Sequence, residues 1–137
     1  MKIKSVLLGL CISLCSTVFA SNMHKHPEDK AVEKTSKEQT MKSPGYCEIE
    51  IINRSFDNVT VSGMFDDGYS MLPFTVYSFG MPQYIDMYYY GYCHAGMSLF
   101  IDAWSGYRVY AGYTQTNTTI HIVPYLTNQL KAEVTKK

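Results

Sequence analysis

The sequence predicts an all-β fold, an antiparallel β-sandwich of about seven short strands, on three observations. From residue 46 onward, apolar and polar residues alternate with a period of two. Clusters of Asn, Asp, Ser and Gly, among them the hairpin-turn signal Asp66-Asp67-Gly68, interrupt the alternation roughly every ten residues, a spacing typical of short strands joined by turns. No window in residues 46–127 has the period of a helix. A small closed β-barrel is the alternative, because it has the same sequence pattern.

Residues 1–20 have the features of a bacterial Sec-type signal peptide. A short positive start, MKIK, precedes an apolar run that ends in VFA, where small residues suit cleavage after Ala20. The run is shorter than the roughly 20 apolar residues of a membrane span. We therefore expect a secreted or periplasmic protein with no stable membrane insertion once the signal is removed.

Residues 21–45 are predicted to be a disordered charged leader. The segment contains no aromatic residue and is rich in Lys, Asp and Glu, so it cannot bury enough apolar surface to offset the entropy of ordering. Its two histidines, His24 and His26, are interpreted as solvated. His24 would stand fourth in the mature chain, one position too late for an amino-terminal copper site, and no metal site is expected.

The domain at residues 46–127 begins with CEIEII, in which Cys47, Ile49 and Ile51 point to one side of a strand. Pro73 marks the third run as an edge or broken strand, because proline lacks the N–H that a central strand donates. Residues 128–137 carry no strand pattern and are predicted to be a polar C-terminal tail or a frayed helix. The predicted runs cover residues 47–52, 59–65, 69–79, 84–94, 97–104, 107–113 and 119–125.

Two cysteines, Cys47 and Cys93, remain after removal of the signal peptide. In an exported chain an even pair predicts a disulfide, since the periplasm and the extracellular space permit oxidation. Two free buried thiols are the alternative.

Charge excludes two classes of partner. Residues 46–127 contain seven acidic and two basic residues, a net charge near −5. Nucleic-acid binding needs a basic patch, and anionic lipid surfaces need Lys and Arg clusters. We expect neither partner.

Catalytic motifs are absent from the sequence, including GxSxG and HExxH. His94 is interpreted as a turn residue after Cys93, and His121 as an outward residue of the last strand. Asp86 and Asp102 lie in aromatic strands that could form a hairpin, and facing carboxylates can hydrolyse a glycosidic bond. Two solvent-facing aspartates are the favoured interpretation, so no catalytic residue and no cofactor is predicted.

Tyrosines dominate the stretch YIDMYYYGYCH. Alternation places Ile85, Met87 and Tyr89 on a core face, and the remaining tyrosines on a half-exposed face. Exposed aromatic planes stack on sugar rings and on protein side chains. The alternative is that these rings only cover the second sheet or pair across strands. The predicted recognition face consists of Tyr84, Tyr88, Tyr90, Tyr92, Phe100 and Trp104.

The positive signal, the Lys- and Glu-rich leader and the pattern CEIEI…YYYGYCH…WSGY resemble small exported proteins of Legionella-like intracellular bacteria. The resemblance implies export and brings no functional residue with it. We expect a non-enzymatic binding protein for a glycan or a protein. The alternatives are an inhibitor of a hydrolase and a carboxylate-based glycan hydrolase, and the sequence leaves the oligomeric state open.

Overall fold

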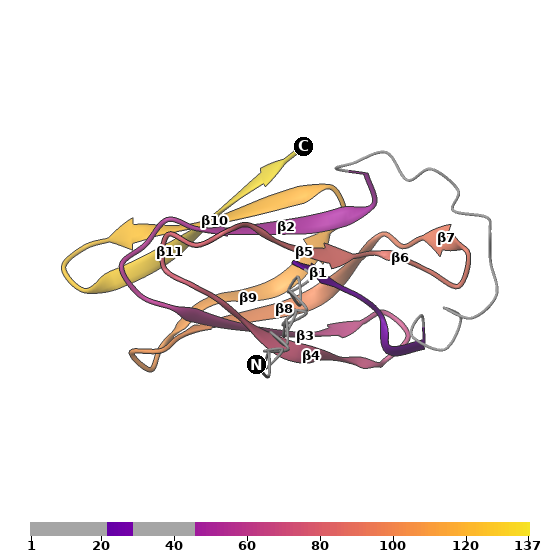
Figure 1. Ribbon diagram of the computed structural model, residues 1–137, viewed down its shortest axis with the longest axis horizontal. Coiled ribbons are helices and arrows are strands. Elements are labelled where there is room, and N and C mark those ends of the chain that lie inside the picture. Colours follow the sequence, from indigo (N-terminus) through magenta and orange to yellow (C-terminus); the bar gives the residue numbers. More distant parts are fainter. Residues whose placement is uncertain (1–21, 29–45) are drawn as a thin grey trace, which may run out of the picture.

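The computed structural model describes residues 22–28 and 46–137, and within them the regular structure consists of strands, apart from a short 3₁₀ segment at residues 27–28 (Figure 1). Two main sheets pack face to face, so the predicted all-β sandwich is confirmed, and they do not close into the alternative barrel. One sheet has the order β1 (Met23–His24), β5 (Gln83–Asp86), β2 (Glu48–Asn53), β10 (Thr118–Tyr125) and β11 (Gln129–Lys136). The other has the order β4 (Ser70–Val76), β3 (Val59–Phe65), β8 (Gly96–Ala103) and β9 (Arg108–Gln115). A small hairpin of β6 (Tyr88–Tyr89) and β7 (Tyr92–Cys93) completes the set.

The core lies between the two sheets and follows the period-two pattern. Each inner strand turns alternate side chains inward, and the chain buries them completely. Full burial of one such aliphatic side chain contributes about 1.5–3 kcal/mol. The central members are Ile49 and Ile51 of β2, Ile120 and Ile122 of β10, Val59 and Val61 of β3, and Leu99 and Ile101 of β8.

Most strand pairs are antiparallel, as predicted, but two are parallel. β10 runs parallel to β2, and β1 runs parallel to β5. The parallel pairing of β10 with β2 arises because β9 belongs to the other sheet, so the chain crosses between the sheets before β10. Asn117, at a positive φ of 62°, fixes this crossing: its side chain accepts a hydrogen bond from the Cys47 N–H (2.7 Å) and its N–H donates to the Glu48 carbonyl (2.8 Å).

The C-terminal segment differs from the polar tail that the sequence predicts. It forms β11, which pairs with β10 over its whole length. As an edge strand, β11 needs few apolar residues, and only Leu130 is fully buried. Charged residues discourage pairing with other chains at such an edge. Lys137 continues past β11 and lies 3.1 Å from both Glu48 and Glu50.

The predicted disordered leader also needs correction over residues 22–28. Met23 and His24 form β1 at the edge of β5, and the His24 ring stacks on Phe74 with centroids 3.5 Å apart. His26 is completely buried, so the interpretation of both histidines as solvated is wrong. Aromatic stacking on the folded domain supplies the apolar contact that the segment's own composition lacks. The other predicted leader residues and the predicted signal peptide lie outside the described residues.

The predicted disulfide is confirmed. Cys47 and Cys93 are bonded, with their Cα atoms 5.7 Å apart and a separation of 46 positions in sequence. In the chain-entropy account a loop of this length stabilises the fold by on the order of 4 kcal/mol. The bond fastens the β6–β7 hairpin to the start of β2.

Within the described residues, no helix is long and apolar enough to span a bilayer.

Candidate functional site

The tyrosine-rich stretch is divided among β5, β6 and β7 instead of forming one strand. Tyr90 and Gly91 have φ of 54° and 83° and form the two-residue turn between β6 and β7. Positive φ at both positions is the geometry of a type I′ hairpin turn. The predicted core face is present up to this turn, because Ile85, Met87 and Tyr89 are all fully buried. Beyond Tyr89, the turn replaces the predicted strand alternation.

The six residues of the predicted recognition face do not come together. Tyr88, Tyr90 and Tyr92 are exposed on the β6–β7 hairpin, at one end of the sandwich. Trp104 lies in the β8–β9 turn at the opposite end (Figure 1). The remaining two, Tyr84 and Phe100, stand next to the buried residues Ile85 and Ile101 on different sheets. Each therefore lies on the outer surface of its own sheet.

Asp86 and Asp102 do not form the facing pair that a glycan hydrolase would need. Asp86 is next to buried Ile85 in the five-stranded sheet, and Asp102 is next to buried Ile101 in the four-stranded sheet. Their side chains therefore point out of opposite faces of the sandwich. Asp102 accepts hydrogen bonds from Arg108 at 2.8 and 3.2 Å, and this contact lowers the pKa of Asp102.

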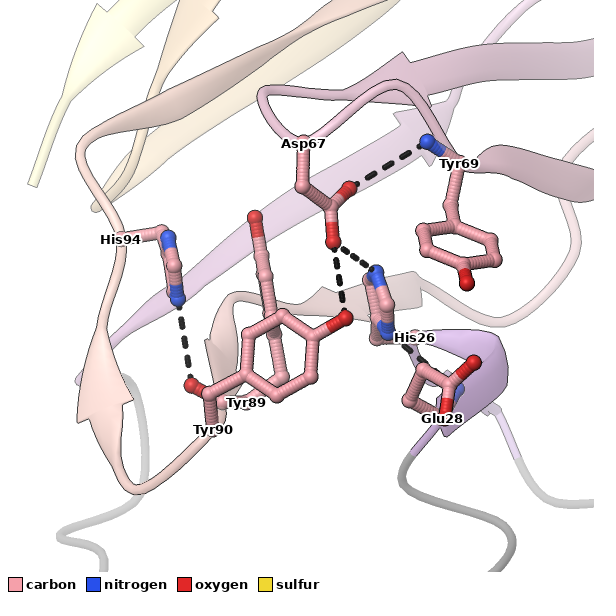
Figure 2. Close-up of polar contacts among 7 residues, drawn as sticks. All are labelled: His26, Glu28, Asp67, Tyr69, Tyr89, Tyr90 and His94. Atoms are coloured by element: carbon pink, nitrogen blue, oxygen red, sulfur yellow. Dashed lines mark hydrogen bonds and ion pairs between the residues drawn. The ribbon is translucent and has the colours of Figure 1, made fainter.

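His26 is the centre of a cluster at the hairpin end of the sandwich (Figure 2). Its Nδ1 accepts a hydrogen bond from the Glu28 N–H at 3.2 Å, which assigns the ring proton to Nε2. Nε2 then donates to the Asp67 carboxylate at 2.9 Å. Both ring nitrogens of this buried side chain are therefore satisfied.

Aromatic rings enclose His26. The Tyr89 ring is nearly parallel to it, with centroids 4.2 Å apart and an interplanar angle of 11°. Three further rings are inclined to it by 60–72°, with centroids 4.7–5.3 Å away. We call this enclosure the cage; it consists of Phe65, Tyr69, Tyr89, Tyr90 and the carboxylate of Asp67.

His94 extends the stack on the far side of Tyr89. Its ring lies 3.6 Å from the Tyr89 ring at 3°, and Tyr92 lies 4.0 Å from His94 at 29°. Its Nε2 is also 3.1 Å from the Tyr89 carbonyl oxygen. His94 therefore packs as part of a four-ring stack, a role that the sequence interpretation as a turn residue missed. The Tyr89 hydroxyl is buried and makes no hydrogen bond within the described residues, and burial raises its pKa.

Asp67 holds the cage together. Burial acts to raise the pKa of Asp67, but hydrogen bonds from the Tyr69 N–H (3.2 Å) and the Tyr90 hydroxyl (3.1 Å) outweigh it and lower the pKa. Burial, with this contact to Asp67, raises the pKa of Tyr90 to about 12. The sequence predicts the Asp66-Asp67-Gly68 turn correctly, and Gly68 has a φ of 89°. It gives no signal that Asp67 would bind a histidine 41 positions earlier.

The opposite end of the sandwich carries exposed aromatic side chains on three loops. The loops follow β2, β4 and β8, and we call their exposed aromatic surface the loop end. Sequence reasoning found only Trp104. Phe56 lies in a predicted turn, and Tyr77 and Phe79 fall within the predicted strand 69–79, which in the structure ends at Val76. The members, with the exposed fraction of each, are Phe56 (52%), Tyr77 (61%), Phe79 (73%) and Trp104 (58%).

Polar side chains tie these three loops to one another. The Ser105 N–H and hydroxyl donate to Asp57 at 3.0 and 2.7 Å, joining the β8–β9 turn to the β2–β3 loop. The Ser78 N–H donates to the Asn58 side chain at 2.9 Å, joining the β4–β5 loop to the same segment. The Ser105 hydroxyl bond lowers the pKa of Asp57. The loop end is therefore a fixed surface whose polar groups bond internally.

Comparisons of the chain with protein-family models, with curated proteins and with solved structures find no match. The described residues contain no group of three His, Cys, Asp or Glu side chains arranged to hold a metal ion.

Proposed function

We propose that the protein is an exported, non-enzymatic binding protein that recognises a protein partner through the loop end. The observation that carries the proposal is the exposure of four large aromatic side chains on three loops that hydrogen-bond to one another. Large exposed apolar patches mark interaction sites. Loops that a rigid scaffold positions are the usual place for binding residues.

Pre-organisation adds to this argument. A loop that is already ordered loses little conformational entropy when a partner binds, so more of the contact energy appears as affinity. The Asp57–Ser105 and Asn58–Ser78 bonds order the loops in advance. Aromatic side chains in such positions often contribute 2 kcal/mol or more to binding, by the general behaviour of interface hot spots.

A protein suits the loop end better than a glycan. Sugar recognition combines a stacking ring with polar groups that bond to hydroxyls, whereas the nearby polar side chains already bond to each other. Phe56 and Phe79 offer no polar atom at all. An apolar protein surface is the natural complement, and a hydrolase that the protein inhibits is one partner of this kind.

Export is supported by the confirmed disulfide together with the signal-like residues 1–20. A disulfide is compatible with an oxidising compartment, namely the periplasm or the extracellular space. The amino-terminal sequence has the charge and cleavage pattern of secretory signals. Secretion remains part of the proposal.

The test is cross-linked capture of partners by the full protein and by the double variant Tyr77→Ser/Phe79→Ser. Neither side chain makes a hydrogen bond or ring contact within the described residues, so the variant should fold normally. The matched control is Tyr46→Ser/Leu72→Ser, which removes two equally exposed apolar groups outside the loop end.

We expect one partner whose capture falls at least about tenfold in the loop-end variant and not in the control, since two lost hot spots exceed 1.4 kcal/mol. Equal capture by both variants would contradict the proposal. Trp104-dependent binding to a glycan array, with no protein captured, would show that the partner of the loop end is a glycan and not a protein.

A further inference from the structure

The cage around His26 has the composition of a cation-binding site. Four aromatic rings surround the imidazole, and the Asp67 carboxylate lies at 2.9 Å from its Nε2. Aromatic rings present a negative face, and cages of such rings bind quaternary and methylated ammonium groups. A carboxylate beside the rings adds direct charge attraction.

The charges around the cage favour a positive ligand. Asp67 is hydrogen-bonded to Tyr90, and Asp66 of the same turn accepts a hydrogen bond from the Tyr113 hydroxyl at 3.0 Å. Glu28 adds a third carboxylate, close enough to Tyr69 to raise the pKa of that hydroxyl. His26, held as the Nε2–H tautomer, fills the centre of this acidic cluster.

Outside the cage, the segment that carries His26 is held by a short strand and a few hydrogen bonds. Its only strand, β1, has two residues and lies at the edge of the sheet. The Tyr84 N–H donates to the Asn22 carbonyl at 2.8 Å, and the His24 side chain bonds to Gln83 at 2.9 Å. Short edge segments open locally at a small fraction of the free energy of global unfolding.

We propose that the cage is a binding site for a small methylated ammonium cation of the choline type, and that residues 22–28 are its displaceable occupant. An imidazole ring and a tetramethylammonium ion have about the same number of non-hydrogen atoms, so the two groups are of comparable size. When the segment leaves, the cation lies on the face of Tyr89, among the three inclined rings, and pairs with Asp67. The segment and the cation then compete for one site.

This inference does not rest on the proposed protein-binding function. The cage lies at the β6–β7 end of the sandwich and the loop end lies at the other (Figure 1). None of the residues varied to test the loop end belongs to the cage.

The experiment is calorimetric titration of the folded chain with choline and with its uncharged isostere 3,3-dimethyl-1-butanol, at matched ionic strength. In His26→Ala the cage is open, and choline should bind roughly tenfold or more tightly than the alcohol because cation–π contacts and Asp67 act only on the charge. The unaltered chain should bind choline more weakly than His26→Ala, because its own segment must first leave.

His24→Ala is the matched control. It removes the neighbouring histidine of the same segment, whose ring stacks on Phe74 and bonds to Gln83 without a carboxylate. His24→Ala opens no charged cage of its own, so this variant should bind choline and the alcohol with similar affinity. Adding Asp67→Asn to His26→Ala should abolish most of the preference for choline.

Equal affinity of His26→Ala for choline and the alcohol would overturn the proposal. An equal gain in choline affinity in His24→Ala, relative to the unaltered chain, would also overturn it. If His26→Ala does not fold, amide exchange of the unaltered chain decides the question. Saturating choline, but not the alcohol, should speed exchange of the Tyr84 N–H, which bonds to Asn22. Unchanged exchange would contradict the displacement.

Discussion

His26 donates a hydrogen bond from Nε2 to the carboxylate of Asp67 over 2.9 Å, and this bond joins two residues 41 positions apart in sequence. It fixes an N-terminal segment of polar composition to the β3–β4 turn. The four rings around His26 make the joint a buried one. One end of the sandwich therefore depends on a residue outside the main run of strands.

His26→Ala should lower the free energy of unfolding by about 2–4 kcal/mol, because it leaves a cavity among four rings and removes a partner of Asp67. His24→Ala should cost less, about 1 kcal/mol, since its ring stacks on one side only. Urea denaturation of the two variants measures both values. A smaller effect for His26→Ala than for His24→Ala would show that the cage contributes little to stability.

Tyr89→Phe should leave stability unchanged or raise it by up to about 1–2 kcal/mol. The Tyr89 hydroxyl is buried without a hydrogen bond within the described residues, and an unsatisfied buried donor costs about 1–3 kcal/mol. Thermal and urea unfolding of the purified variant would measure the change. Tyr89→Ala, which removes the whole ring, should cost about 3–5 kcal/mol through loss of the stack. Comparison of the two variants distinguishes the contribution of the ring to stability from that of the hydroxyl. Clear destabilisation by Tyr89→Phe would mean that the hydroxyl has a bonding partner in solution.

The parts of the fold that sequence predicts are those in which each strand carries its own apolar alternation. The alternating isoleucines predict β2 and β10, and the export context predicts the Cys47–Cys93 bond. β11 could not be read, because an edge strand with one buried leucine has almost no alternation. Residues 22–28 could not be read either, since their order comes from rings on distant strands.

The candidate sites show the same division between local and distant causes. The Asp66-Asp67-Gly68 turn was predictable from local chemistry, but its contact with His26 depends on how the chain returns to that end. The β6–β7 turn at Tyr90-Gly91 lacks the Asn-Gly or Asp-Gly pair that usually marks such turns. Without a recognised turn, the period-two alternation of a strand continues past Tyr90 and places four tyrosines on one face.

Stability should fall in acid through Asp67. Its pKa is lowered in the folded state, so its contribution is complete above the unfolded value of about 3.9 and is lost as pH falls through the lower folded value. Asp67→Asn should cost about 1.5–3 kcal/mol near pH 6, by the general strength of hydrogen bonds to charged groups. The difference in free energy of unfolding between the unaltered protein and Asp67→Asn should be smaller at pH 3. Urea midpoints at both pH values test this, and a constant gap would assign the effect to packing alone.

Replacing both disulfide cysteines by serine should lower stability by about 2–5 kcal/mol. The loss should be local as well as global, because Cys93 lies in β7 and holds the hairpin that carries Tyr89 and Tyr90 against β2. Near-ultraviolet circular dichroism reports on the stacked tyrosines, and we expect its signal to weaken in the double variant. Non-reducing mass spectrometry of the unaltered protein should show the two cysteines linked, and two free thiols would contradict the assignment.

Asp57→Ala should loosen the loop end without unfolding the sandwich. The Asp57 carboxylate accepts two hydrogen bonds from Ser105, whereas the Asp57 carbonyl, which accepts from buried Asn53, is kept in the variant. The expected loss of stability is therefore small, about 1–2 kcal/mol. The Ser105 N–H should exchange faster by roughly tenfold or more, because its acceptor is gone. Asp66→Ala is the control, since Asp66 lies at the other end. If exchange at Ser105 stays unchanged in Asp57→Ala, the loops are ordered by contacts other than this bond, and the pre-organisation argued for partner binding would have to come from Asn58 and Ser78.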